Sequence, residues 1–366
     1  MKRFTTVLAL ATLAAPAAAQ RGSWQTEIGI QGGYSQIKPA GTGRDDKIKA
    51  FDLPGSSFIL GVLTSAPVYA IIPWKDKIAI EPSLGFSQSQ FGTEINLGML
   101  GLRADYALST EFYAAAGGVL GYLNSGSQDV KQLGVTAAVG YRRHLVGALN
   151  ARLEASTTFR KKTTDLAPSN SYSVLLGVST RTGGGASASS PARRGPSNQA
   201  WEPVLGVSGG YAGIHAVGGA FTGTTFSMPG VGASAEALGI PIGGPPTLFA
   251  IFPLGSKLGI EPGLDLRHID QPASSSAINA SARLDYAVDG GWYGAAGATM
   301  TNINPRTVAA KWVAGVVVAW GYRFQLTSAF GGRMEMSYNM RQKSTDLGLP
   351  PINIFAVSLG ATMPLR

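Results

Sequence analysis

Apolar and polar residues alternate along most of this chain with a period of two, whereas an amphipathic helix repeats every 3.6 residues. In 149–160 one face holds Leu149, Leu153 and Phe159, and the opposite face holds Asn150, Arg152, Glu154 and Arg160. Successive side chains of a β-strand point to opposite faces of its sheet, so this alternation is typical of strands with one apolar face. The pattern therefore predicts an all-β, antiparallel protein.

The alternation predicts eight strands in the first half of the chain and eight matching strands between Trp201 and Met363. The first eight are expected near 24–37, 56–72, 77–89, 94–107, 111–123, 131–142, 147–161 and 170–180. Within 94–106 the apolar face changes near Met99 and Leu100, which predicts a β-bulge in that strand.

The connections between the strands are expected to alternate in length. Connections after odd-numbered strands are interpreted as long and polar, as in 38–55, and those after even-numbered strands as short, as in 74–77. Aromatic residues gather beside the short turns, namely Trp74, Tyr106, Phe112, Tyr141, Phe252, Tyr286, Trp292 and Tyr322. This layout is typical of a barrel that crosses a bacterial outer membrane.

The second half repeats the first at an offset of 177 to 181 residues. Trp24 and Gly32-Gly33-Tyr34 recur as Trp201 and Gly209-Gly210-Tyr211. Arg103-x-Asp105 and Arg152-x-Glu154 recur as Arg283-x-Asp285 and Arg333-x-Glu335. Glycine, serine and proline dominate 181–200, which favours a flexible linker. The expected organisation is a first barrel repeat over 20–180, this linker, and a second repeat over 201–366.

Residues 1–19 are interpreted as a secretory signal peptide. Lys2 and Arg3 give the positive start, an apolar stretch follows, and Pro16 precedes three alanines that suit cleavage before Gln20. Later apolar runs, such as 66–74 and 312–320, are too short for a spanning helix, which needs about 20 residues. If the chain crosses a membrane, it must do so as a closed β-barrel.

Composition narrows the possible chemistry. The 366 residues include no cysteine, which excludes disulfides, thiol catalysis, cysteine-bound metals and a lipoprotein anchor. The formal net charge of +9 falls to +7 without Lys2 and Arg3. A basic exported protein is expected to meet anionic lipids and lipopolysaccharide rather than nucleic acid.

The placement of charges favours a membrane barrel over a soluble one. Lysines fall in loops or near strand ends, whereas the charges within strands are mostly arginines and carboxylates among small residues.

In the first repeat, four carboxylates face four arginines on the polar face: Glu27, Glu81, Asp105 and Glu154 against Arg103, Arg142, Arg152 and Arg160. In the second, five face five: Glu202, Glu261, Asp265, Asp285 and Glu335 against Arg267, Arg283, Arg323, Arg333 and Arg341. Such balanced sets suit a closed polar interior, because buried charge is tolerated when it is paired. The alternative interpretation is a set of ordinary solvated surface charges.

We therefore predict a network of charges in the lumen of each repeat, with Glu81 against Arg103 and Glu261 against Arg283. Its proposed members are Glu81, Arg103, Asp105, Arg142, Arg152, Glu154, Arg160, Glu261, Arg283, Asp285, Arg323, Arg333, Glu335 and Arg341.

With these features, each half resembles the small eight-stranded outer-membrane β-barrels of Gram-negative bacteria. The resemblance implies an outer-membrane location, contact with outer-membrane lipids and lipopolysaccharide, and insertion by the barrel-assembly machinery. Such chains usually end in an aromatic residue, whereas this one ends in Met363-Pro364-Leu365-Arg366. Two separate barrels are favoured, and one porin-like barrel of sixteen strands is the alternative.

No catalytic, cofactor-binding or metal site is predicted. His268-x-Asp270 near Ser274 could suggest a hydrolase triad, but the matching stretch of the first half has no histidine. Three functions stay open: a structural or surface-interaction protein with an unknown extracellular ligand, a passive channel for small solutes, and a barrel enzyme that acts on lipids.

Overall fold

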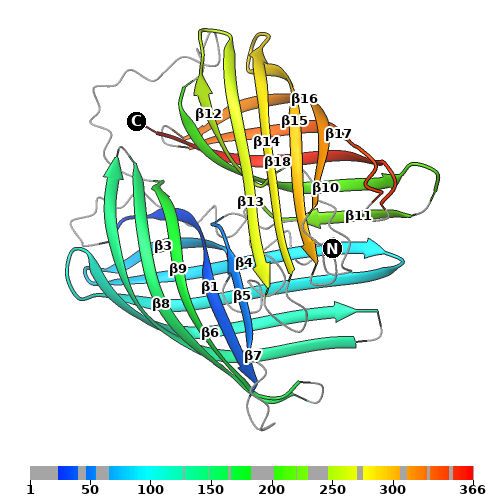
Figure 1. The fold of residues 1–366 in the computed structure, drawn as a ribbon. Helices are drawn as coiled ribbons and strands as arrows, with labels where there is room; N and C mark the ends of the chain where they lie inside the picture. The colour runs from blue at the N-terminus through cyan, green and yellow to red at the C-terminus, as the bar shows by residue number, and fades with distance from the viewer. Residues whose placement is uncertain are drawn as a thin grey trace.

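The computed structural model describes residues 24–39, 47–54, 66–126, 128–146, 148–163, 166–182, 202–219, 221–229, 246–269, 275–305, 311–327, 330–345 and 349–365. These residues form eighteen antiparallel strands, β1 to β18 (Figure 1). The predicted all-β barrel architecture is confirmed. Within the described part of the chain, no helix has the length and apolar character needed to cross a membrane.

The strands of the first half close on themselves. They are β1 (Glu27–Pro39), β2 (Ile48–Asp52), β3 (Val68–Lys75), β4 (Ile78–Phe91), β5 (Thr93–Ala107), β6 (Phe112–Ser125), β7 (Gln128–Val146), β8 (Leu149–Arg160) and β9 (Ser169–Arg181). Neighbours from β3 to β9 pair in sequence order, β3 pairs with β1, and β1 pairs with β9. This pairing gives a ring of eight strands, counted without β2.

The second half repeats this pairing. Its strands are β10 (Val204–Ala216), β11 (Thr222–Ser227), β12 (Leu248–Pro253), β13 (Leu258–Ile269), β14 (Ser275–Ala287), β15 (Trp292–Pro305), β16 (Lys311–Thr327), β17 (Phe330–Arg341) and β18 (Ile352–Pro364). The ring runs from β12 to β18 and closes through β10, with β11 outside the count. We call the end of each ring that holds the short connections, such as 76–77 between β3 and β4, the turn end. The opposite end is the loop end.

The predicted second strand is split, which corrects the sequence interpretation. The short strand β2 lies inside the segment 38–55 that was expected to be a long polar loop. The next strand, β3, begins only at Val68, and residues 56–65 of the predicted strand 56–72 lie outside the described residues. In the same way, two strands, β11 and β12, take the place of the predicted second strand of the other half.

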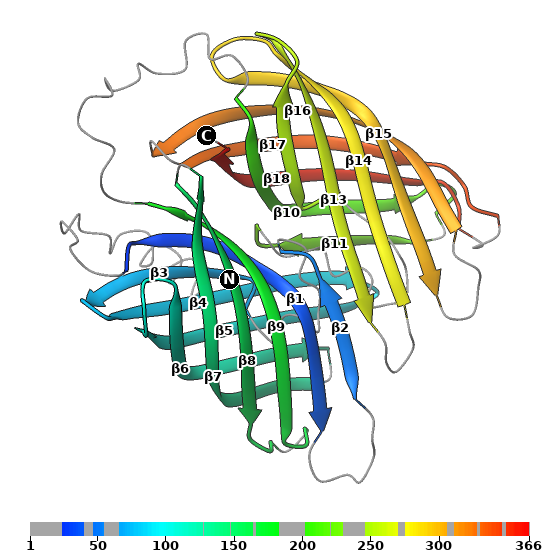
Figure 2. The same cartoon turned by 60° about the vertical axis from the view of Figure 1, so that its left-hand side comes forward.

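The short strands β2 and β11 join the two halves at their loop ends. On one edge β2 pairs with β1, and on the other it pairs with β13, where Asp52 faces Arg267. Likewise β11 pairs with β10 and with β4, where Thr225 faces Ser89. Figure 2 shows β11 between β10 and β4. At this level the pairing follows one circuit of sixteen strands: β1, β2, β13 to β18, β10, β11 and β4 to β9. The described strands thus form two rings at the turn ends and one circuit at the loop ends.

The repeated Gly-Gly-Tyr motif lies where each short strand leaves its neighbour. A Cβ atom on Gly32 of β1 would lie 2.6 Å from the carbonyl carbon of Leu53, directly after β2. A Cβ on Gly209 of β10 would lie 2.3 Å from the carbonyl carbon of Met228, directly after β11. Glycine is needed at both positions because the crossing backbone occupies the space of a side chain.

Two further expectations about local structure are wrong. The connection after β4 is a tight turn rather than a long loop, and Gly92 adopts a positive φ of 78° there. The β5 strand pairs without interruption on both edges, so it has no bulge near Met99. Its apolar face changes because Leu97 and Met99 point inward and pack with Ala66 and Val119.

Polar side chains line the inside of the rings and apolar side chains cover the outside. Along β9 the buried row includes Ser169, Ser171, Ser173 and Ser179, whereas Tyr172, Val174 and Leu176 are exposed. The apolar face that sequence alternation reveals is therefore the outer face of the barrels.

Candidate functional site: a charge cluster inside each ring

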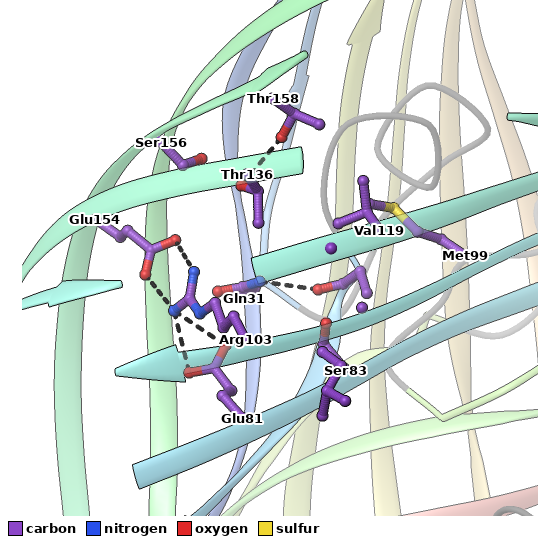
Figure 3. Close-up of a pocket in the computed structure, with 14 residues that line it drawn as sticks. Gln31, Glu81, Ser83, Met99, Arg103, Val119, Thr136, Glu154, Ser156 and Thr158 are labelled. Atoms are coloured by element: carbon purple, nitrogen blue, oxygen red, sulfur yellow. Dashed lines mark hydrogen bonds and ion pairs between the residues drawn. The ribbon is translucent and has the colours of Figure 1, made fainter. Parts of the chain in front are cut away.

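The first ring encloses a compact cluster of buried charges near its turn end. Arg103 of β5 lies between two glutamates: its Nη2 is 3.0 Å from Glu81 Oε1, and its Nη1 donates to Glu154 Oε1 at 2.8 Å. Its Nε lies 3.1 Å from Asp105 Oδ1. Figure 3 shows Glu81, Arg103 and Glu154 pointing toward one another from three strands. One guanidinium thus contacts three carboxylates that are all nearly inaccessible to solvent.

Arg152 completes this cluster from β8. Its Nη1 donates to Glu81 Oε2 at 2.6 Å, and its Nη2 pairs with Glu154 on the same strand. The guanidinium carbon stacks 4.4 Å from the centre of the Tyr69 ring, and the Tyr113 hydroxyl donates to Glu154 Oε2 at 2.6 Å. The planar guanidinium suits this site because it can donate to two carboxylates while stacking on a ring.

The second ring holds the corresponding cluster. Arg283 Nη1 donates to Glu335 Oε1 at 2.9 Å, and Arg283 Nη2 lies 2.9 Å from Glu261 Oε1. Arg283 Nε is 3.1 Å from Asp285, and Arg333 Nη1 donates to Glu261 Oε2 at 2.5 Å. Two aromatic rings contribute as before: the Tyr293 hydroxyl donates to Glu335 at 2.6 Å, and Arg333 stacks 3.7 Å from the centre of the Phe249 ring.

The strand register explains why these side chains meet. Glu81 is directly opposite Arg103 in the β4–β5 pair, and Glu261 is directly opposite Arg283 in the β13–β14 pair. Opposite residues of an antiparallel pair have Cβ atoms about 5 Å apart and point to the same face. The two pairs that the sequence predicts are therefore in contact, inside their rings.

The remaining predicted arginines lie on either side of the clusters. Toward the turn end, Arg142 Nη1 is 3.3 Å from Glu27 Oε1, and Arg323 stacks 5.5 Å from the centre of the Tyr293 ring. Toward the loop end, Arg160 donates to Ser171 Oγ at 3.0 Å, and Arg341 donates to Asn279 Oδ1 at 3.4 Å.

A small cavity lies beside the first cluster. It is lined by charged and hydroxyl-bearing residues such as Glu81, Arg103, Ser156 and Thr158, and by Met99 (Figure 3). The cavity has a volume of about 30 Å³. A space of this size holds a few water molecules at most.

Sequence reasoning missed the aromatic members of the clusters. Phe112 was assigned to the belt beside the turns and is exposed, but its neighbour Tyr113 is almost fully buried. The signal was available: Tyr113 alternates in phase with the small residues Ala115 and Gly117, which are typical of a crowded interior.

The hydrolase hypothesis gains nothing from the geometry. His268 Nδ1 lies 2.8 Å from Ser276 Oγ in an exposed position, and Asp270 and Ser274 lie outside the described residues. Among the described residues, no group of histidines and carboxylates has the arrangement of a metal site.

No family model and no curated protein matches the chain. Its structural neighbours are Gram-negative outer-membrane β-barrel proteins. The monoaromatic hydrocarbon channel CymD is 8% identical, with 93% of this chain and 89% of that chain covered and a TM-score of 0.30. The attachment invasion locus protein Ail of Yersinia pestis is 15% identical, with coverages of 43% and 100% and a TM-score of 0.26. The toluene transporter TodX of Pseudomonas putida is 12% identical, with coverages of 96% and 93% and a TM-score of 0.29. At these scores we base the function on the chain's own geometry.

Proposed function

We propose that this chain is an outer-membrane β-barrel protein with a structural or surface-interaction role, whose lumens are closed at the turn ends by the arginine–carboxylate clusters. The observation that carries the proposal is the inverted distribution of side chains, with charges buried inside and large apolar residues exposed outside. A soluble barrel would have the opposite distribution.

The exposed apolar surface has the composition expected for contact with lipid. Its central band holds aliphatic residues, among them Leu133, Val135, Leu153, Val174, Leu176, Val316, Val318, Met334, Met336 and Leu359. Exposed aromatic residues flank this band toward the turn ends, including Trp74, Phe112, Phe252 and Trp292, and toward the loop ends, including Phe159, Tyr172, Trp312 and Phe355. Aromatic girdles at both edges of an apolar band are typical of outer-membrane barrels.

The clusters support a closed lumen. Arg103, Arg152 and Glu154 fill the first ring with short ion pairs, and replacing any of these residues would leave a buried charge unpaired. A passive channel needs a continuous water-filled path, whereas ion pairs connect β4 and β5 with β8 inside the first ring near its turn end.

Two measurements on the refolded full-length protein test the proposal. We expect the protein to fractionate with outer membranes and to migrate faster on gels when it is not heated, as compact barrels do. In planar bilayers we expect wild-type protein to show no steady conductance. Steady conductance steps from wild-type protein would instead establish the channel function, and a soluble periplasmic protein would contradict both.

The export step and the partners belong to the same proposal. Removal of residues 1–19 would leave Gln20 at the start of the mature chain, which N-terminal sequencing of the membrane fraction would identify. The basic net charge and the exposed girdles support contact with anionic lipids and lipopolysaccharide. Insertion would require the barrel-assembly machinery, and depletion of that machinery should leave the precursor out of the membrane.

A further inference from the structure

Arg160 differs from the arginines of the charge clusters. It is 6% exposed at the loop end of β8, yet none of the described carboxylates lies within ion-pair distance of it. Its Nη1 donates to Ser171 Oγ at 3.0 Å, and its buried Nη2 has no hydrogen-bond partner in the described structure. Arginine stays protonated in proteins, so this position holds a buried cation whose charge is not neutralised.

The wall beside Arg160 is built from hydroxyl groups. Ser169 is directly opposite Arg160 in the β8–β9 pair, and Ser171 and Ser173 continue the same inward row. All three serines are buried. The Ser171 hydroxyl accepts a hydrogen bond from Arg160 and keeps its own hydrogen for another acceptor. The site therefore offers a positive charge and hydrogen-bond donors on adjacent strands.

The corresponding place in the second half is built differently. Arg341 is directly opposite Ile352, and the row continues with Ile354 and Ala356. These apolar side chains pack with Ala212, Ile214 and Phe221 in one cluster. The inner face beside the arginine therefore bears hydroxyl groups in the first half and packed apolar side chains in the second. This difference makes the first half the better place for a polar ligand.

Among the described residues, lysines outnumber carboxylates on the exposed rim above Arg160, which also carries Glu94 and Asp129. Lys38, Lys131, Lys161 and Lys162 are exposed at the loop ends of β1, β7 and β8, and of these Lys131 lies 3.5 Å from Asp129. Like charges around the mouth of a low-dielectric lumen attract ions of the opposite sign and raise their local concentration.

We propose that the inner face of β8 and β9, at their loop end, binds a small oxyanion through Arg160 Nη2 and the hydroxyls of Ser169 and Ser171. The chemical class is a phosphate, sulfate or carboxylate group, because a guanidinium and hydroxyl donors match its oxygens and neutralise the cation. This site goes beyond the closed-lumen function and does not depend on it.

Titration of the refolded full-length protein with inorganic phosphate in a phosphate-free detergent tests the site. Calorimetry should give saturable binding to wild-type protein. Arg160→Gln should raise the Kd at least about tenfold, because it removes a charge-assisted hydrogen bond. Ser171→Ile, which copies the wall of the second half, should raise it as well. The matched control Arg341→Gln should leave the Kd unchanged.

Heat-modifiable gel mobility confirms that each variant is folded, and Arg160→Lys keeps the charge if Arg160→Gln fails to fold. With Arg160→Lys we expect weaker phosphate binding than in wild-type protein, because lysine cannot reproduce the guanidinium fork. Titrations with sulfate and acetate cover the rest of the class. Absence of saturable binding of all three anions at millimolar concentration would overturn the proposal, and so would phosphate binding that is equal in wild-type protein and in the folded Arg160 variants.

The same titration in bilayers separates two sources of the anion. If a free ion fills the site, phosphate affinity should be equal in phosphatidylcholine and in phosphatidylglycerol-rich bilayers. If a lipid headgroup fills it, phosphatidylglycerol should compete and lower the apparent affinity, again only while Arg160 is intact.

Discussion

The two halves of this molecule have similar charge clusters but differ in the residues that face inward near their loop ends. Arg103 and Arg283 each contact two glutamates and an aspartate, with similar distances. Above them, the first half presents Ser169 and Ser171 where the second presents Ile352 and Ile354. The two halves therefore share the charge clusters near their turn ends and differ in the inward-facing residues near their loop ends.

Breaking the shared feature should have the largest effect. Arg152→Met and Arg333→Met each remove an arginine whose carboxylate partners remain buried, so each should lower the free energy of unfolding by about 3–5 kcal/mol. Urea unfolding of the refolded protein in detergent measures this change. Lys47→Met, which alters a partly exposed lysine before β2, should change stability by no more than about 0.5 kcal/mol. Similar, near-zero effects at Arg152 and Lys47 would mean that the lumen is solvated.

Exchanging the inward-facing residues of β9 and β18 tests whether the two halves differ at their loop ends. Ile354 is 1% exposed within the apolar cluster of the second half, so Ile354→Ser should cost about 2–5 kcal/mol through lost burial and a hydroxyl in apolar surroundings. The reciprocal Ser171→Ile adds volume to a polar lumen and should cost less, about 1–3 kcal/mol. If Ile354→Ser is tolerated without loss, the second lumen is not packed and the halves do not differ in this way.

The joint between the halves can be tested at the repeated glycine. A Cβ on Gly32 would meet the backbone after β2, which has little room to move, so Gly32→Ala should destabilise the protein by about 1–3 kcal/mol. Gly98→Ala is the matched control, because its Cβ would meet nothing closer than 3.8 Å. The same unfolding measurement applies, and equal midpoints for the two variants would contradict the close crossing.

The smallest effect is expected where the clusters themselves differ. Tyr69 stacks on Arg152, whereas Phe249 stacks on Arg333, so the cluster of the second half forms without this hydroxyl. Tyr69→Phe keeps the ring and should change stability by less than about 1 kcal/mol. A loss comparable to that of Arg152→Met would show that the hydroxyl holds the first cluster together.

The strands and the charge clusters were accessible to sequence analysis because both depend on local periodicity. Glu81, Arg103, Arg152 and Glu154 fall on the polar phase of long alternating strands, and antiparallel neighbours bring such phases together. The strand boundaries from β4 to β9 agree with the alternation to within a few residues. Tyr113 was missed because only its neighbour Phe112 was assigned a place, among the aromatic residues beside the turns, and the in-phase small residues Ala115 and Gly117 were not used.

The joining of the halves could not be predicted in this way. The strand β2 has five residues, among them Lys49 and Asp52, so it resembles a polar loop in composition. Its second partner, β13, lies in the other half of the chain, and a local pattern carries no information about which distant edge a strand meets. The prediction of a bulge near Met99 was wrong for a related reason. The apolar side chains of Leu97 and Met99 fill the lumen, and in the sequence this looks the same as a change of strand register.

The split second strand has a consequence for the order of folding. Each ring can close at its turn end with strands from its own half, because β1 meets β3 and β9, and β10 meets β12 and β18. The outer edges of β2 and of the loop-end part of β4 pair with β13 and β11, which belong to the second half of the chain. Contacts between such distant segments form slowly, because a long stretch of chain must first be brought together. If the first half closes before the second has folded, two of its loop-end edges stay unpaired and open to the wrong partner until β11 and β13 reach them.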